Sequence, residues 1–234
     1  MVRAHSDLEI TLDIMLAGCA CGGAVTQVGK TVVDVDGVPQ AIVCVQCESC
    51  GATGEREYDI STFFDAGDTR DGPLNPTERP SEILDIVQYA HLARFYLEYV
   101  QINAVELTRA AADNLLRIAE AGAAEALKHL GDGDEAPPES VFAADRQMLL
   151  ETNREAFSRE NLVLFAQGIA QHRERLSTLY DILGQLTGEE QNDNQILENY
   201  AARYKDDPIL FPWIGRVAFE LHRRRGGGDH QHRH

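Results

Sequence analysis

Apolar and polar residues alternate near the start of the chain. Five apolar side chains occupy every second position from Leu8 to Leu16, and polar residues separate them except at Met15. A strand that points successive side chains to opposite faces produces this period of two. The pattern therefore predicts a β-strand over residues 8–16 with one buried face.

Two further apolar segments surround a turn signal. The β-branched stretch Val25 to Val35 is followed by Asp36-Gly37 and then by the run Ala41 to Val45. Asp-Gly tolerates the positive φ angles of a tight two-residue turn, so these segments predict a β-hairpin. A further strand is predicted over residues 55–60, and residues 1–64 together form a small β module.

The pattern changes after residue 64. Residues 65–80 contain three prolines and two glycines without a periodic apolar pattern, which is typical of a linker or an ordered loop. Beyond Ser81, which we expect to cap a helix, apolar residues recur with helical spacing: Ile86, Ala90, Ala93, Leu97 and Val100.

Amphipathic segments continue to the end of an α-helical domain over residues 81–225. Helices are predicted over residues 103–130, around 141–153 and from about 162 to 183, with a break at 131–140. Thr187 with Glu190 forms a capping-box pattern for the next helix, and a last helix ends near Arg225. Residues 226–234 are glycines and polar residues, so we expect them to form a disordered tail. The fold class is thus α+β, with an antiparallel β module followed by a helical bundle.

Composition and charge restrict the function. The 234 residues are 44% hydrophobic and 25% charged, which is typical of globular proteins, and the formal net charge is -17. Such an acidic chain repels phosphate backbones, so general binding to nucleic acid or anionic membranes is disfavoured. No apolar run reaches the roughly 18 to 20 residues needed to cross a bilayer, and we expect a cytoplasmic protein.

The cysteines carry the strongest chemical signal. All five lie between Cys19 and Cys50, which favours a local metal cluster over a disulfide framework. Cys19-Ala-Cys21-Gly-Gly and Cys47-Glu-Ser-Cys50-Gly place one cysteine pair at each of two glycine turns. Zinc prefers four tetrahedral ligands of this kind, and four thiolates leave no open coordination position. The spacing predicts a structural Zn²⁺ bound by Cys19, Cys21, Cys47 and Cys50.

Another choice of ligands remains open. Cys44 lies three residues before Cys47 and competes with Cys50 as its partner, although only Cys50 is followed by a glycine. The run Cys44-x-x-Cys47-x-x-Cys50 is also compatible with an iron–sulfur centre. We favour zinc with Cys44 as a strand residue.

The two cysteine pairs resemble the zinc-ribbon fold group, with Cys-x-Cys in place of the usual first Cys-x-x-Cys. Together with the passages from Cys50 to Asp65 and from Pro80 to Asp85, they also resemble uncharacterised bacterial proteins that join a ribbon to a helical domain. This resemblance covers about the first hundred residues and implies no known activity.

These observations favour a non-enzymatic adaptor or assembly subunit that binds a protein partner or a second copy of itself. Residues 1–75 contain four basic and twelve acidic side chains, a balance that disfavours nucleic acid as the partner. A nucleic-acid-associated regulator that uses the ribbon is therefore the second hypothesis. A third hypothesis is an enzyme with its site in the helical domain. No catalytic residues are assigned to it: Glu125 and His129 are spaced to share a helix face, but isolated pairs of this kind usually have a structural or solvated role.

Overall fold

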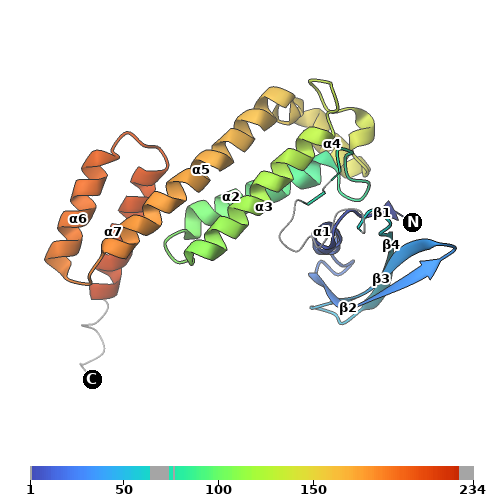
Figure 1. Ribbon diagram of the computed structural model, residues 1–234, viewed down its shortest axis with the longest axis horizontal. Helices are drawn as coiled ribbons and strands as arrows, with labels where there is room; N and C mark the ends of the chain where they lie inside the picture. Colours follow the sequence, from blue (N-terminus) through green and yellow to red (C-terminus); the bar gives the residue numbers. More distant parts are fainter. Residues whose placement is uncertain (1, 64–73, 76, 227–234) are drawn as a thin grey trace. The chain divides into compact units, whose positions relative to one another are not determined.

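The computed structural model describes residues 2–63, 74–75 and 77–226 (Figure 1). The strands are β1 (Val2–Arg3), β2 (Val25–Val35), β3 (Val38–Cys47) and β4 (Thr53–Asp59). The α-helices are α1 (Asp7–Ala17), α2 (Ile86–Asn103), α3 (Arg109–Lys128), α4 (Ala144–Thr152), α5 (Arg159–Gln185), α6 (Glu190–Arg203) and α7 (Leu210–Gly226), with short 3-10 helices at Pro138–Ser140 and Arg154–Phe157. A small N-terminal sheet and a long helical segment confirm the α+β class.

The sheet has the strand order β1-β4-β3-β2. β2 and β3 form the predicted hairpin, in which Asp36 and Gly37 have φ angles of 54° and 83°. The side chain of Asp34 accepts a hydrogen bond from the Gly37 amide at 2.8 Å and closes the turn. β4 pairs with β3 in antiparallel orientation, close to the predicted bounds, whereas the short β1 pairs with β4 in parallel.

The predicted strand over residues 8–16 is wrong, because this segment forms helix α1. Ser6 caps the helix by accepting a hydrogen bond from the Glu9 amide at 3.1 Å. The apolar residues at every second position fall on more than one side of the helix, so they mimic a strand pattern. Leu16 and Met15 are exposed, whereas Ile10 and Ile14, one helical turn apart, are buried.

Helix α1 packs on the sheet. Ile10 and Ile14 join a hydrophobic cluster with residues from all of the longer strands, including Val43 of β3 and Tyr58 of β4. Asp13 also links α1 to β4, because its carboxylate accepts hydrogen bonds from Tyr58 Oη at 2.6 Å and from Arg56 at 2.9 Å. Helix α1 and the sheet therefore share one hydrophobic core, and Cys19 of the first cysteine loop packs against it.

The described chain divides into two compact units. One comprises Met1–Ala93 with Ala121–Ala166, and the other comprises Arg94–Glu120 with Gln167–His234. The sheet, α1 and α4 belong to the first unit, and α6 and α7 belong to the second. Most of the predicted linker and nearly all of the predicted tail, residues 64–73, 76 and 227–234, lie outside the described residues.

Two predicted helix starts need correction. Helix α2 begins at Ile86 and not after Ser81, and Asp85 and Gln88 accept hydrogen bonds from each other's amides. This is a capping box, and Ser81 instead accepts amide hydrogen bonds in the turn before it. Helix α6 begins at Glu190 with Glu189 at its N-cap, so Thr187 and Glu190 do not form the predicted capping box. The buried Asp193 instead accepts hydrogen bonds from the Thr187 and Gly188 amides, which precede the helix.

Candidate metal centre

The cysteines lie in two neighbouring loops. Cys19 and Cys21 follow helix α1, while Cys47 ends β3 and Cys50 lies in the turn that leads to β4. Pairing of Val25 with Cys47 in the hairpin aligns the two loops, and the Glu48 amide donates a hydrogen bond to the Ala24 carbonyl at 2.9 Å. The hairpin thus brings together cysteines that are 26 and 31 residues apart.

The four sulfur atoms of Cys19, Cys21, Cys47 and Cys50 lie within 4.8 Å of one another. The Cys19 and Cys50 sulfurs are 3.7 Å apart, and the Cys21 and Cys47 sulfurs are 3.5 Å apart. A tetrahedron with metal–sulfur bonds of about 2.3 Å has sulfur–sulfur edges of about 3.8 Å. The four cysteines can therefore hold a metal ion, in an arrangement consistent with a zinc-ribbon-like site.

Glycines shape both loops. Gly22 and Gly51 have φ angles of 82° and 72°, in the left-handed region that favours glycine. Gly23 is required for a different reason, since a Cβ atom there would lie 2.5 Å from the Ser49 hydroxyl and 2.8 Å from the Cys47 sulfur. The absence of a side chain at this position allows the two loops to approach each other.

Charge in the cluster favours a bound cation. Amide hydrogen bonds from Cys50 and Ser49 lower the pKa of the Cys47 thiol to about 6. The Gly23 amide likewise favours a thiolate at Cys21, but hydrogen bonding with the neighbouring cysteine sulfurs raises the pKa of that thiol to about 12. Four thiolates at these distances repel one another, and a divalent cation compensates their charge.

Cys44 does not belong to the cluster. It lies within β3, three residues before Cys47, and its sulfur is 4.0 Å from a carboxylate oxygen of Glu55 on β4. Because side chains three positions apart on a strand point to opposite faces, Cys44 and Cys47 cannot form a pair without disrupting the strand. The structure therefore does not assemble the alternative set of Cys44, Cys47 and Cys50.

The comparisons with known proteins add no assignment. No known protein family matches the chain, and no match is found among curated proteins or solved structures. Within the described residues, no helix combines the length and the apolar character needed to cross a membrane.

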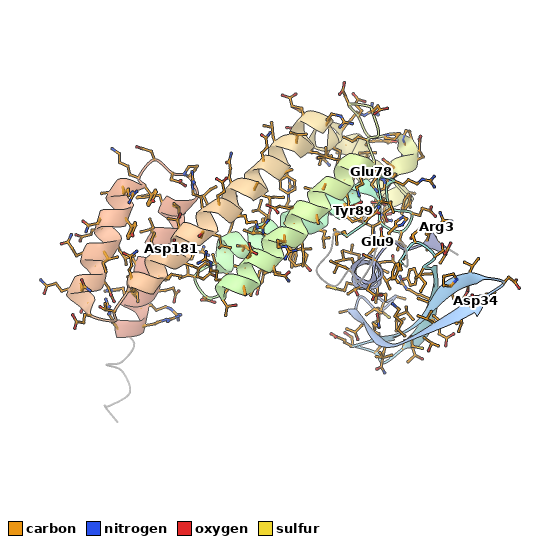
Figure 2. All side chains as sticks on the ribbon, viewed as in Figure 1. Arg3, Glu9, Asp34, Glu78, Tyr89 and Asp181 are labelled. Carbon is orange, nitrogen blue, oxygen red and sulfur yellow. The ribbon has the colours of Figure 1, made fainter. Side chains whose placement is uncertain are left out.

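A buried polar network in the same unit was not predicted. Glu9 of α1 is fully buried and accepts hydrogen bonds from the His5 amide at 2.6 Å and from Tyr89 Oη of α2 at 2.9 Å (Figure 2). Lys128 at the end of α3 donates to the Asn75 carbonyl and to the Glu125 carboxylate, at 2.8 and 2.7 Å. Burial raises the pKa of both carboxyls, and that of Glu125 reaches about 7.

A pocket of about 430 Å³ lies beside this network. Its lining includes His129, Ser140, Glu139 and Phe142. Burial lowers the pKa of His129 to about 4, so the ring is neutral at physiological pH. The Leu84 carbonyl accepts a hydrogen bond from this ring, and the buried Nε2 has no hydrogen-bond partner among the described residues.

Proposed function

We propose that the chain is a zinc-binding, non-enzymatic adaptor or assembly subunit. Cys19, Cys21, Cys47 and Cys50 hold a structural Zn²⁺, and the β module in which they lie binds a protein partner. The observation that supports zinc is the cluster of four sulfurs with edges of 3.5 and 3.7 Å. Four protein thiolates fill a tetrahedral shell, so the ion fixes the loops and has no position for a substrate.

The basic side chains of the β module favour a protein over a nucleic acid as partner. Arg3 pairs with Asp59 and Arg56 pairs with Asp13, at 3.2 and 2.9 Å, and Lys30 pairs with Asp7. Arg70 lies outside the described residues. Binding of a phosphate backbone needs cationic groups that are free to replace counterions, and these three are already neutralised by carboxylates.

The free edge of the sheet provides a surface for such a partner. β2 is an edge strand, and no other strand among the described residues pairs with its outer side. Val28, Val32 and Val35 of β2 are 58%, 52% and 43% exposed. An apolar edge strand of this kind can accept an added strand from another chain, since unpaired backbone groups supply the hydrogen bonds.

Elemental analysis tests the metal assignment. We expect one zinc per chain in the purified protein and none in the double variant Cys21→Ser, Cys50→Ser. The matched control is Cys44→Ser, which removes a cysteine outside the cluster and retains the metal. A protein free of bound metal, or iron in place of zinc, contradicts the assignment.

A pull-down from the native cell tests the adaptor role. We expect a protein that copurifies with the full chain and is lost with Val32→Lys, which puts a charge on the sheet edge. Met148→Lys is the matched control, because Met148 is 67% exposed on α4. Sedimentation of the purified chain distinguishes a second copy from another protein. A partner that tolerates Val32→Lys contradicts binding at this edge.

The pocket beside His129 supports a second candidate function, an enzymatic or ligand-binding site in the helical segment. The unpartnered ring nitrogen of this neutral histidine can accept a hydrogen bond from a ligand, and Phe142, 46% exposed, offers an apolar wall. Buried polar atoms normally have partners, which makes this one notable.

Thermal denaturation in the presence of a panel of small metabolites tests this second candidate. A ligand of the pocket is expected to raise the melting temperature of the parent protein and of Phe95→Ala, but not that of Phe142→Ala. Phe95 is a matched control because it is 61% exposed on α2 and does not line the pocket. A panel without any stabilising compound argues against a site there.

A further inference from the structure

The four clustered cysteines differ in their exposure. Cys21 and Cys50 are exposed, whereas Cys47 is buried and Cys19 is intermediate. The two short sulfur–sulfur distances each join one exposed cysteine to a more shielded one, Cys21 to Cys47 at 3.5 Å and Cys50 to Cys19 at 3.7 Å. Each pair thus contains one solvent-exposed cysteine and a second, less exposed cysteine whose sulfur lies close enough to react with it.

Exposed thiolates are nucleophiles, and oxidants convert them to sulfenic acids that condense with a nearby thiol. We propose that this centre is a site of oxidative modification, in which hydroperoxides form the disulfides Cys21–Cys47 and Cys19–Cys50 and release the zinc. This inference rests on the proposed zinc binding and adds a regulation of the same site.

The chemistry balances with a hydroperoxide as the oxidant. Zinc coordination keeps Cys21 deprotonated, although the pKa of its free thiol is raised. This zinc-bound thiolate attacks one peroxide oxygen, the O–O bond breaks, the sulfur becomes a sulfenic acid, and the released hydroxide takes up a proton to form water. The thiolate of Cys47 then attacks that sulfur, the S–S bond forms, and the sulfenic oxygen leaves as water after taking up protons. Cys50 and Cys19 react in the same way. In total, one Zn²⁺ bound by four thiolates, two hydrogen peroxide molecules and four protons give two disulfides, four water molecules and one free Zn²⁺.

The pairing determines what happens to the fold. Both disulfides cross from the loop after α1 to the loop after β3, so the cross-links replace the metal in holding the two loops together. The alternative Cys47–Cys50 disulfide lies within one loop and leaves the other loop unattached. We therefore expect oxidation to expel zinc while the β module stays folded.

The experiment uses the zinc-loaded full chain and hydrogen peroxide, with a chromogenic chelator to report free zinc. We expect one zinc released per chain for two peroxide molecules consumed, and peptide mapping is expected to find Cys21–Cys47 and Cys19–Cys50. Dithiothreitol with added zinc restores the starting state. Circular dichroism before and after oxidation is expected to be unchanged.

The Cys44→Ser variant is the matched control and is expected to release zinc with the same stoichiometry. A zinc-loaded chain that retains its metal in peroxide overturns this inference and leaves the zinc assignment standing. A Cys47–Cys50 disulfide, or loss of the circular dichroism signal on oxidation, also overturns it. A purified chain that contains no zinc and takes up none overturns the zinc assignment and this inference together.

Discussion

Two regions of the first compact unit are ordered by different means. The cysteine loops contain few apolar side chains and are joined by backbone hydrogen bonds and by the four-sulfur cluster. The network around Glu9 lies instead among buried apolar residues and is joined by charged and polar side chains of α1, α2 and α3. On the proposed zinc binding, the first region depends on a group from outside the chain, whereas the second depends on partners that the chain itself supplies.

This difference determines what each region loses when its stabilising group is removed. If the cluster binds zinc, removing the metal leaves four crowded sulfurs in loops with little core, and we expect the loops to lose their order while the hydrophobic cluster under α1 remains. Removing one buried carboxylate leaves its donors without partners inside an otherwise intact core.

The largest expected effect follows metal removal. Structural zinc contributes on the order of 10 kcal/mol of apparent binding free energy in small zinc domains. We expect a chelator to raise amide hydrogen exchange in the loop residues 19–24 and 48–52 to the rates of an unstructured peptide. Amides of α6 and α7, in the other compact unit, are expected to keep their protection.

The same measurement on Cys21→Ser, Cys50→Ser without chelator is expected to reproduce the unprotected loops. Adding chelator to this variant should change nothing further. Loops that stay protected after complete metal loss would show that the ion does not order them.

The next largest effect concerns the buried carboxylate. Glu9→Ala leaves the Tyr89 hydroxyl and the His5 amide without an acceptor, and we expect a loss of about 3 kcal/mol in the free energy of unfolding. Urea denaturation measures the loss. Glu57→Ala, at an exposed position of β4, is the control and should change stability by less than about 0.5 kcal/mol. Equal effects of the two substitutions would contradict the structural role of Glu9.

The same contrast explains what the sequence reveals. The cysteine cluster is predictable because four residues of one type, with glycines at fixed positions, identify the chemistry from spacing alone. Cys44 remained ambiguous, since its exclusion depends on the face of β3 to which it points. The hairpin was likewise predictable from the two-residue turn at Asp36-Gly37.

The Glu9 network could not be predicted, because its members are far apart along the chain. Glu9 and Tyr89 are separated by 80 positions, and no local pattern marks them as partners. The strand predicted over residues 8–16 is wrong because only some of the alternating apolar residues, Ile10 and Ile14, belong to the cluster with the sheet. The alternation therefore does not mark one buried face. Tertiary packing, rather than local propensity, determines such a segment. Ser6 and the acids that follow it were the available helix signal.

A third prediction concerns pH and the pair of Glu125 and His129. Glu125 has a folded-state pKa of about 7 against an ordinary 4.5, so its contribution to stability decreases as pH rises through that interval. His129 has a folded-state pKa of about 4 against 6.5, so its contribution decreases as pH falls. Between pH 4.5 and 6.5 the two effects oppose each other, and the parent protein is expected to show little pH dependence from this pair.

Single substitutions should separate the pH-dependent contributions of Glu125 and His129 to stability. From pH 6.5 to 4.5, we expect Glu125→Gln to lose about 2 kcal/mol of stability relative to the parent protein and His129→Gln to gain a similar amount. Urea denaturation at several pH values measures both. All three proteins share the same cysteines, so the pH dependence of metal binding cancels in the differences. Parallel pH profiles for the three proteins would contradict the two shifted pKa values.

The smallest expected effect returns to the cysteine loops and concerns Gly23. A Cβ atom at this position overlaps the Ser49 side chain and the Cys47 sulfur, so Gly23→Ala must displace the loops and disturb the sulfur tetrahedron. We expect zinc affinity to fall about tenfold, equivalent to about 1.4 kcal/mol, as measured by competition with a chromogenic chelator.

Gly54→Ala in β4 is the matched control, because a Cβ atom there would lie an ordinary 3.7 Å from its nearest contact, Val45. Since Gly23→Ala keeps all four thiolates, a weakened affinity would show that loop geometry, and not only the set of ligands, determines how tightly the metal is held. Unchanged affinity would mean that the loops can relax around the added methyl group without loss of the site.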